Sequence, residues 1–457
     1  MADQNSPPIR EAHSQRTALS RLADVITTAR NSNISQLGGR VIEIGRNHYL
    51  VEGLGNSGRL GDIITVTSDG RQTMGEIIRL QTGRAVVKPF ESTDMIKLGD
   101  TAWLTERLDI RPAMSWKGRT LNAMAKPIDG LGELEEGLRG YERDRPPPLP
   151  MTLQRISKPV KTGVRVIDMF TPLCCGQRIG IFAGSGVGKS SLLSMLARGQ
   201  SVDSVVLALV GERGREVRDF LDDVLGNQKQ RTIAVVASSA ESAMMRRLAP
   251  HTAMCIAEYL RDEGEDVLLI VDSLTRYAHA SREFGLAAGE PPVARGFPPS
   301  VFSDLPRLLE RSGPGKENSG SITGIFSVLV EGDDHNDPIA DTIRGILDGH
   351  IVLERGIADQ GRYPAVNLLS SISRLAHISW TASQRNLIQK LKALIARFEE
   401  SRDLRSVGAY QPGADPELDD AVKIVPKLYE ALTQQASETD TQNAFAVVAA
   451  HLGDKKG

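Results

Sequence analysis

The chain has 457 residues, with 55 Lys and Arg against 57 Asp and Glu and a net charge of −2. This near balance argues against a bulk basic surface for nucleic acid and against an acidic tail. At about 150 residues per domain, the length predicts about three domains. Hydrophobic residues make up 40% and aromatic residues 4%. These fractions are typical of a globular protein without broad platforms for base stacking.

No apolar run approaches the roughly 18–20 residues that a membrane-spanning helix needs. The first residues are polar, so we expect no cleaved secretion leader. The three cysteines, Cys174, Cys175 and Cys255, lack C-x-x-C spacing and cannot form a disulfide framework. We therefore expect a cytoplasmic protein with reduced, buried cysteines.

Residues 1–33 are predicted to form an N-terminal extension with one amphipathic helix. Apolar side chains recur at helical spacing within residues 10–30, and polar residues 31–33 separate this stretch from the rest. The stripe either packs on the chain's own body or docks a partner, and the sequence does not decide between them. Its members are Leu19, Leu22, Val25, Ile26 and Ala29.

Three further domains are predicted. Residues 34–105 alternate short β-branched runs with glycine-rich turns, which indicates a small β-barrel. Residues 106–378 are predicted to form the central domain, because residues 164–373 alternate apolar strands with helical stretches, the pattern of a parallel sheet with helices on its faces. Residues 379–457 are predicted to be helical. The sheet strands are expected at residues 178–183, 204–210, 232–237, 267–271 and 323–330.

The strongest motif follows the first of these sheet strands and precedes a helical run. Residues 183–190 are Ala-Gly-Ser-Gly-Val-Gly-Lys-Ser, in the strand–loop–helix context of a phosphate-binding loop. Glycines let the backbone turn its N–H groups towards phosphate oxygens, and the helix N-terminus adds partial positive charge. Ala183 stands where the strict motif has glycine.

The loop predicts that the central domain of this α/β fold binds nucleotide. Lys189 is expected to reach the terminal phosphates, and the Ser190 hydroxyl is expected to ligate Mg²⁺. The predicted nucleotide-binding residues of the loop are Gly184, Ser185, Gly186, Val187, Gly188, Lys189, Ser190 and Ser191.

Two carboxylates follow other strands of the predicted sheet. Asp272 ends the strand at 267–271, where an aspartate can hold Mg²⁺ opposite Ser190 or simply cap a helix. Glu212 follows the strand at 204–210, and ligands of open α/β sheets bind outside the carboxyl ends of the strands. Glu212 is therefore placed to orient an attacking water, unless it is a solvated loop residue.

Hydrolysis of a triphosphate also gains from an arginine at the transition-state oxygens, often supplied by a neighbouring chain. Spacing alone does not choose among the candidates. They are Arg276, Arg307, Arg344, Arg355 and Arg374.

The combination of these motifs resembles the rotary ATP synthase α/β-subunit family. Within that family it is most similar to the ATPases of type III protein export, and specifically to the flagellar branch. The likeness spans roughly residues 35–430, and it implies a RecA-like fold for the central domain. It is carried by residues 182–191, 211–213, 289–302, 305–311, 320–323, 331–334, 337–341, 346–350, 363–365 and 373–374.

The resemblance implies roles for four residues around the phosphates. Lys189 matches the family's phosphate lysine, and Ser190 matches its Mg²⁺ hydroxyl. Glu212 matches the carboxylate that activates water, and Arg213 matches a contact of the γ-phosphate.

It implies four further roles around the same nucleotide. Asp272 matches the carboxylate on the Mg²⁺ side, and Arg276 matches an arginine near the γ-phosphate. Tyr363 matches the aromatic residue on which adenine stacks. Arg374 matches the arginine finger that acts on the site of the adjacent subunit. The site then lies between protomers of a ring, which we expect to be a homohexamer.

The branches of the family differ at a few positions. Glu212 favours a catalytic chain over the family's non-catalytic ring subunit. Residues 408–416 resemble the export ATPases where the synthase catalytic subunit has an acidic loop. Residues 337–341 favour the flagellar branch over the injectisome branch.

The resemblance implies a Mg²⁺-dependent ATP hydrolase that energises export of flagellar subunits from the inner face of the cytoplasmic membrane, with peripheral attachment only. It implies a stator-like regulator at the N-terminal helix, a central coiled-coil stalk near Tyr410, and export-gate and chaperone–cargo partners, without nucleic acid. An injectisome ATPase and a synthase catalytic subunit are the alternatives within the family. A hexameric RNA translocase and a purely structural nucleotide-binding subunit are alternatives of other classes.

Overall fold

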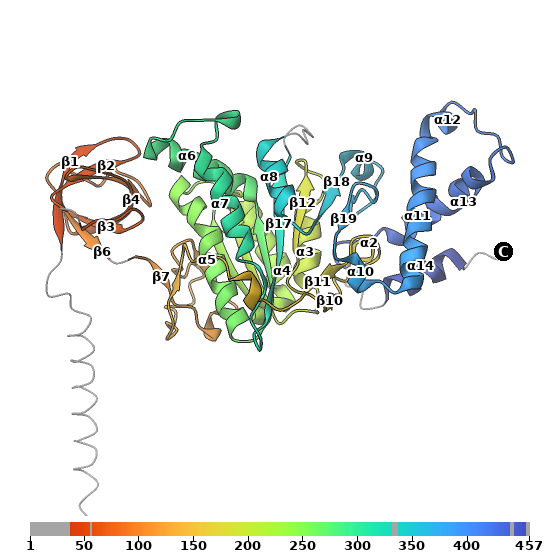
Figure 1. The fold of residues 1–457 in the computed structure, drawn as a ribbon, viewed down its shortest axis with the longest axis horizontal. Coiled ribbons are helices and arrows are strands. Elements are labelled where there is room, and N and C mark those ends of the chain that lie inside the picture. Colours follow the sequence, from red (N-terminus) through yellow and green to blue (C-terminus); the bar gives the residue numbers. More distant parts are fainter. Residues whose placement is uncertain (1–36, 55–56, 106, 331–336, 439–442, 454–457) are drawn as a thin grey trace, which may run out of the picture. The chain divides into compact units, whose positions relative to one another are not determined.

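The computed structural model describes residues 37–54, 57–105, 107–330, 337–438 and 443–453. These residues fold as two compact units, of which one contains the N-terminal barrel (Figure 1). The amphipathic helix predicted within residues 10–30 and the family motif at residues 331–334 lie outside the described residues.

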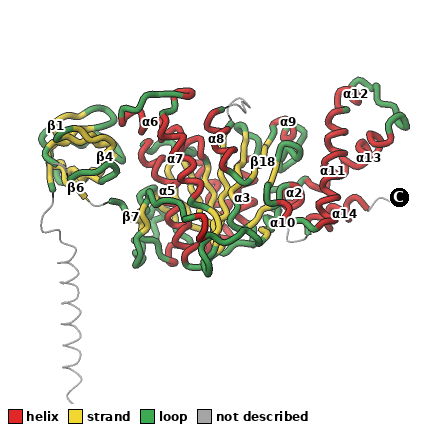
Figure 2. Tube along the Cα trace, viewed as in Figure 1, coloured by secondary structure: helices red, strands yellow, loops and turns green. Residues whose placement is uncertain are grey.

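The N-terminal unit is a closed barrel with the strand order β1-β2-β5-β4-β3-β6 (Figure 2). The β-barrel prediction is confirmed. It omitted most of β4 because Gln72, Thr73 and Glu76 interrupt the apolar pattern there. The strands are β1 (Gly38–Ile44), β2 (Tyr49–Glu52), β3 (Ile63–Ser68), β4 (Arg71–Gln81), β5 (Arg84–Pro89) and β6 (Thr101–Thr105).

The second unit is built on one large sheet with the order β19-β18-β12-β17-β15-β13-β14-β8. Its central strands pair in parallel, whereas β19 pairs with β18 in the antiparallel direction. All five predicted strands are present within two residues of their expected limits. The strands are β8 (Thr120–Asn122), β12 (Arg178–Ala183), β13 (Ser204–Val210), β14 (Thr232–Ala237), β15 (Asp266–Asp272), β17 (Ser321–Leu329), β18 (Gly349–Leu353) and β19 (Ile372–Ser373).

Short strands complete this unit. β16 (Gly313–Pro314) pairs with β17. Two small sheets pair β7 (Asp109–Ile110) with β9 (Tyr141–Glu142), and β10 (Pro159–Val160) with β11 (Leu173–Cys174).

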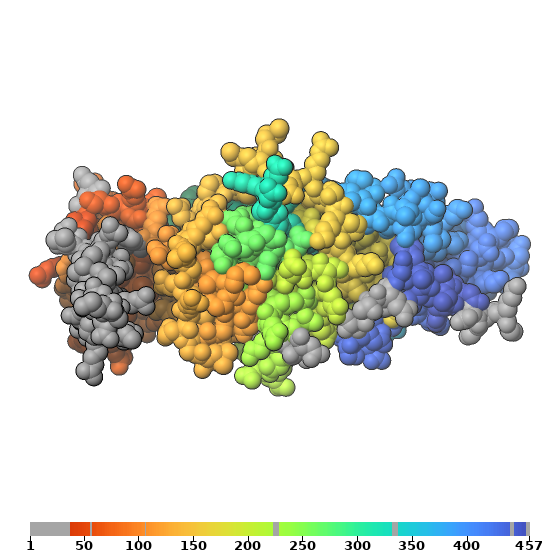
Figure 3. Space-filling view, turned by 90° about the horizontal axis from the view of Figure 1, so that it is seen from below, coloured from red at the N-terminus to blue at the C-terminus, as the bar shows by residue number. Residues whose placement is uncertain are grey.

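Helices connect the strands and form the C-terminal region. One continuous apolar core joins the sheet with α2, α3, α4, α11, α13 and α14, so the C-terminal helices pack directly on the nucleotide-binding part (Figure 3). The helices are α2 (Arg165–Phe170), α3 (Lys189–Arg198), α4 (Gly214–Gln228), α5 (Ala243–Asp262), α6 (Leu274–Ala288), α7 (Pro299–Glu310), α8 (Pro338–Ile346), α9 (Arg355–Ala358), α10 (Ala376–Ser379), α11 (Ala382–Glu400), α12 (Arg402–Ser406), α13 (Pro416–Leu432) and α14 (Ala444–Gly453).

Two predictions from composition can be compared with this structure. Cys174, Cys175 and Cys255 are buried free thiols, as expected. Among the described residues, no helix is long and apolar enough to span a membrane.

A buried ion pair joins α5 to the end of α7. Arg311 donates to both carboxylate oxygens of Glu258 at 3.0 and 2.9 Å, and each side chain is only 2% exposed. Burial alone would lower the pKa of Arg311, but the Glu258 carboxylate raises it overall. Removing one partner would leave the other charge buried without its counterion.

We therefore expect Glu258→Gln to lower the free energy of unfolding by about 3–5 kcal/mol, the usual cost of breaking a buried pair. Urea denaturation followed by circular dichroism measures this. Asp222→Asn is the control, because Asp222 pairs with Arg218 on the surface at 2.9 Å with both side chains exposed. Equal effects of the two substitutions would contradict the account.

Candidate nucleotide-binding site

The phosphate loop joins β12 to α3. β12 ends at Ala183 and α3 begins at Lys189, so residues 184–188 form the turn between them. Gly186 and Gly188 have φ angles of 79° and 91°, which side chains other than glycine rarely adopt. The first N–H groups of α3 have no carbonyl partner within the helix and are available to an anion.

The Lys189 ammonium lies between two carboxylates from different strands. It donates to Oδ1 of Asp272 at the end of β15, and it lies 3.6 Å from Oε1 of Glu212, which follows β13. Ser327 of β17 also donates to Asp272 Oδ1, at 2.5 Å. The side chains of Lys189 and Asp272 are 10% and 4% exposed. Four strand ends of the sheet, including that of β12, therefore converge on one charged cluster.

Glu212 lies in a partly desolvated position at this cluster. Burial raises its pKa above the ordinary glutamate value, and nearby Asp272 adds to this, while Lys189 and Arg276 oppose it. A carboxylate whose pKa is raised is a better proton acceptor than a solvated one. This environment agrees with a chemical role for Glu212 better than with a solvated loop residue.

A cavity of about 680 Å³ opens over the phosphate loop, within the usual range for ligand pockets. In the described part of the chain, the buried Nε of Arg276 has no hydrogen-bond partner at this cavity. An unsatisfied guanidinium nitrogen at the cavity fits an anionic ligand. The lining residues are Gly184, Ser185, Gly186, Gly188, Lys189, Ser190, Ser191, Glu212, Arg213, Glu216, Thr275, Arg276, His279, Leu329, Val330 and Arg355.

The donor set beside the loop fits Mg²⁺. Ser190 offers an exposed hydroxyl at the start of α3. Within the described residues, hydrogen bonds reach Oδ1 of Asp272 and none reaches Oδ2. These residues contain no cluster of three or more His, Cys, Asp or Glu that could form a protein-only metal cage. Mg²⁺ needs no such cage, because it usually keeps several waters and binds phosphate oxygens with one or two protein ligands.

The ring of Tyr363 packs against the phosphate loop at Gly188. A Cβ added to Gly188 would come within 3.3 Å of a Tyr363 ring carbon, so one edge of the ring rests on the glycine backbone. Tyr363 is 43% exposed, which leaves ring surface accessible to a ligand. This is a suitable arrangement for stacking with a base.

The structure does not bring every predicted residue to the cavity. Val187 is buried in the core, 1% exposed. Arg213 lines the cavity, but its side chain is 82% exposed and lies 3.6 Å from Glu216. Arg374 is exposed beyond β19, at the edge of the sheet, and does not line the cavity of its own chain.

The sequence prediction did not assign three residues that support the site. Arg355 Nη2 donates to the Ser185 carbonyl of the phosphate loop at 2.8 Å. Thr275 Oγ1 accepts from Leu329 N at 2.9 Å and so fixes the end of β17. Ser327 orients Asp272. Arg355 was one of five arginines among which sequence spacing did not choose. No motif or spacing in the sequence distinguishes Thr275 or Ser327 from other residues.

Comparisons with known proteins agree with this geometry. Residues 34–105 match the ATP synthase alpha/beta family β-barrel domain, and residues 163–373 match its nucleotide-binding domain. Residues 380–446 match the C-terminal domain of the type III secretion ATPase EscN. The flagellum-specific ATP synthase of Rhizobium meliloti (strain 1021) is 53% identical over 448 residues, covering 96% of each chain. The chain belongs to the ATP synthase alpha/beta family.

Other relatives within this family refine the placement. The flagellum-specific ATP synthase of Agrobacterium fabrum (strain C58) is 54% identical over 417 residues, covering 91% of this chain and 88% of its own. A solved structure of assembled EscN from enteropathogenic E. coli, in complex with its central stalk EscO, superposes with a TM-score of 0.82. It is 38% identical, covering 90% of this chain and 98% of EscN. The resemblance to the flagellar branch is therefore confirmed, and EscN, from a type III secretion system, is less similar to this chain than the two flagellum-specific relatives.

The contact between Gly188 and Tyr363 predicts the effect of a single methyl group. Gly188→Ala would strain the left-handed backbone and displace the Tyr363 ring, and we expect affinity for a fluorescent ATP analogue to fall about tenfold or more. Gly264→Ala is the matched control, since Gly264 has a φ of 97° with nothing within 4 Å of an added Cβ. Unchanged affinity in Gly188→Ala would contradict this description of the loop.

Proposed function

We propose that this chain is a Mg²⁺-dependent ATP hydrolase that energises export of flagellar subunits across the cytoplasmic membrane. The observation that supports hydrolysis most directly is the placement of Glu212 beside the phosphate lysine, 3.6 Å from its ammonium. The flagellar assignment is supported by relatives of that name at 53% and 54% identity.

The phosphate loop and Lys189 bind and orient the triphosphate. Backbone N–H groups of residues 184–190 hold the phosphate oxygens, and Lys189 neutralises charge that develops on the terminal phosphate. Arg276, whose Nε is unsatisfied at the cavity, adds a second cation. Ser190 and Asp272 would hold Mg²⁺, which would supply positive charge against the phosphates.

Glu212 is the catalytic base in this proposal. Its carboxylate orients the attacking water and accepts its proton, for which the raised pKa is favourable. Arg213, next to it in the chain, is proposed as a γ-phosphate contact that forms when its exposed side chain turns inward. Tyr363 is proposed to stack on adenine.

Arg374 is proposed to act on the site of the adjacent protomer. Its exposed position past β19, away from its own cavity, supports a role in trans. Such an arrangement needs protomers that contact one another head to tail. Head-to-tail contacts form a closed ring when the rotation that relates neighbouring protomers adds up to a full turn. We propose a homohexamer, in line with the similarity to assembled EscN.

The remaining partners are proposed on the same basis. A central coiled-coil stalk is proposed near Tyr410, by analogy with EscO bound to EscN. A stator-like regulator is proposed at the N-terminal helix, with export-gate and chaperone–cargo complexes as further partners, and no nucleic acid. The chain is proposed to lie at the inner face of the cytoplasmic membrane, peripherally attached. We retain residues 1–33, 34–105, 106–378 and 379–457 as the proposed domains.

Measurements of ATP hydrolysis test the proposed enzymatic activity. We expect Glu212→Gln to bind ATP nearly as well as the unmodified chain, with kcat lower by about 10²–10⁴, since removing a general base costs this much. Steady-state phosphate release and equilibrium ATP binding measure the two effects. Asp219→Asn, an exposed position on α4, is the control. Full turnover in Glu212→Gln would refute the role given to Glu212.

The same variants test the export function in the source bacterium. With Glu212→Gln in place of the chromosomal copy, we expect flagellin export to fall strongly, measured by immunoblot of the culture medium. Normal flagellin export in a strain that lacks this chain would refute the flagellar assignment. Loss of other secreted proteins in that strain would favour the injectisome alternative.

A further inference from the structure

The segment from Glu354 to Tyr363 contacts the nucleotide site at two points and the C-terminal helices at a third. It begins directly after β18 and includes α9. Arg355 lies at its start, and Arg362 and Tyr363 lie at its end. None of the roles proposed above uses Arg355 or Arg362.

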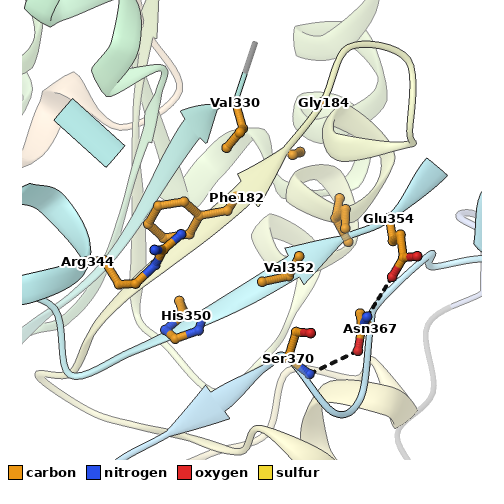
Figure 4. Close-up of a pocket in the computed structure, with 11 residues that line it drawn as sticks. Phe182, Gly184, Val330, Arg344, His350, Val352, Glu354, Asn367 and Ser370 are labelled. Atoms are coloured by element: carbon orange, nitrogen blue, oxygen red, sulfur yellow. Dashed lines mark hydrogen bonds between the residues drawn. The ribbon is translucent and has the colours of Figure 1, made fainter. Parts of the chain in front are cut away.

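The two flanks of this segment are bonded to each other and to β18. Glu354 N donates to the Ala365 carbonyl at 3.0 Å, and Asn367 N donates to the Val352 carbonyl of β18 at 2.8 Å. Asn367 Nδ2 also donates to Glu354 Oε2 at 2.6 Å, and Figure 4 shows this bond beside the phosphate loop. The segment is therefore a closed loop with a fixed base.

Arg355 contacts the phosphate loop. Its Nη2 donates to the Ser185 carbonyl at 2.8 Å. A guanidinium on a carbonyl makes a charge-assisted hydrogen bond, which is stronger than a neutral one. Since the neighbouring N–H groups are those expected to hold phosphate, fixing the Ser185 peptide fixes their directions as well.

Arg362 contacts a ring in the C-terminal helices. Its guanidinium carbon lies 3.6 Å from the centroid of Tyr429 in α13. Tyr429 is itself fixed, because its hydroxyl donates to Glu399 of α11 at 2.7 Å. A cation this close to an aromatic face is attracted by the ring's quadrupole.

The backbone of Tyr363 is held at the same place. Its carbonyl accepts from Gln434 N at 2.8 Å, just after α13 ends. Gln434 is 2% exposed, and its side-chain amide donates to the Gly163 carbonyl at 2.8 Å. The Tyr363 ring then rests on Gly188. The adjacent residues Arg362 and Tyr363 are therefore both held by the C-terminal region, Arg362 through Tyr429 and Tyr363 through Gln434.

We propose that Arg355 and Arg362 are positioning residues with separate targets, Arg355 for the phosphate loop and Arg362 for the ring of Tyr363 that stacks on the base. This inference rests on the proposed nucleotide site. It follows that losing Arg362 weakens recognition of the base while phosphate recognition is unchanged. Losing Arg355 weakens recognition of phosphate whether or not a base is present.

Two probes separate these effects in the full-length chain. A fluorescent ATP analogue is displaced by ATP, which has a base, or by inorganic tripolyphosphate, which has none. For Arg362→Ala we expect affinity for ATP to fall about threefold to thirtyfold, the range of measured cation–π contacts, with tripolyphosphate affinity unchanged. For Arg355→Ala we expect both affinities to fall by the same factor.

A matched variant and a double-mutant cycle complete the test. Arg402→Ala removes an arginine from the same hollow of about 510 Å³ that Arg362 and Tyr429 line, and should leave both affinities unchanged. The losses of ATP affinity caused by Arg362→Ala and Tyr429→Leu should be non-additive, because each substitution removes the same contact. Tyr429→Phe keeps the aromatic ring and should therefore keep the ATP affinity. Equal urea denaturation midpoints for the variants and the unmodified chain would show that the variants are folded.

The outcomes are distinct. Equal losses for ATP and tripolyphosphate in Arg362→Ala would overturn the proposal, and so would additive effects of Arg362→Ala and Tyr429→Leu. If the unmodified chain bound neither probe, the proposed nucleotide site itself would fail. If it bound both normally and the variants behaved like Arg402→Ala, only the positioning roles would fail.

Discussion

The contact on which the site depends is the Lys189 ammonium held between the carboxylates of Glu212 and Asp272. Three charged groups at side-chain exposures of 4–17% would each be costly to bury alone. Together they compensate one another, and Ser327 satisfies Asp272 from the intervening strand. The cluster forms only if β12, β17, β15 and β13 end at the same level. The parallel register of the sheet therefore determines whether the charged groups of the site can meet.

The same sheet order fits the proposal that neighbouring chains complete each site. The strands that carry the cluster lie in the middle of the sheet, whereas Arg374 lies past β19 at its edge. This position is the reason for proposing that Arg374 serves the site of another copy of the chain. The C-terminal helices share an apolar core with α2, α3 and the sheet. The phosphate loop, through Val187, and the C-terminal helices α11, α13 and α14 therefore belong to one packed unit.

The sequence predicted the parts of the fold that depend on local pattern. Strands β12, β13 and β14 have their expected limits because continuous apolar runs are bounded by turn residues. β8, β18 and β19 were not predicted, since they are short and form only through pairing with distant strands. The phosphate loop and its two carboxylates could be predicted because glycine spacing and strand ends are visible in sequence.

Other parts of the site depend on three-dimensional contacts that no local pattern encodes. Tyr363 was assigned through family resemblance alone, and only the structure shows its ring against Gly188. Arg355 could not be separated from four other arginines until its bond to Ser185 was visible. Arg362 had no signal, because its partner Tyr429 lies in a different domain of the predicted architecture.

Mixing two inactive variants tests the central claim, that neighbouring copies complete each site. Lys189→Ala retains Arg374 but cannot hold phosphate, and Arg374→Ala retains its phosphate loop but cannot serve a neighbour. In mixed rings, an Arg374→Ala site next to a Lys189→Ala protomer has every group it needs. We expect ATP hydrolysis, absent or weak in each variant alone, to reappear on mixing and to peak near equal proportions. If no mixture gains activity although the variants assemble together, Arg374 does not act in trans and the account is wrong.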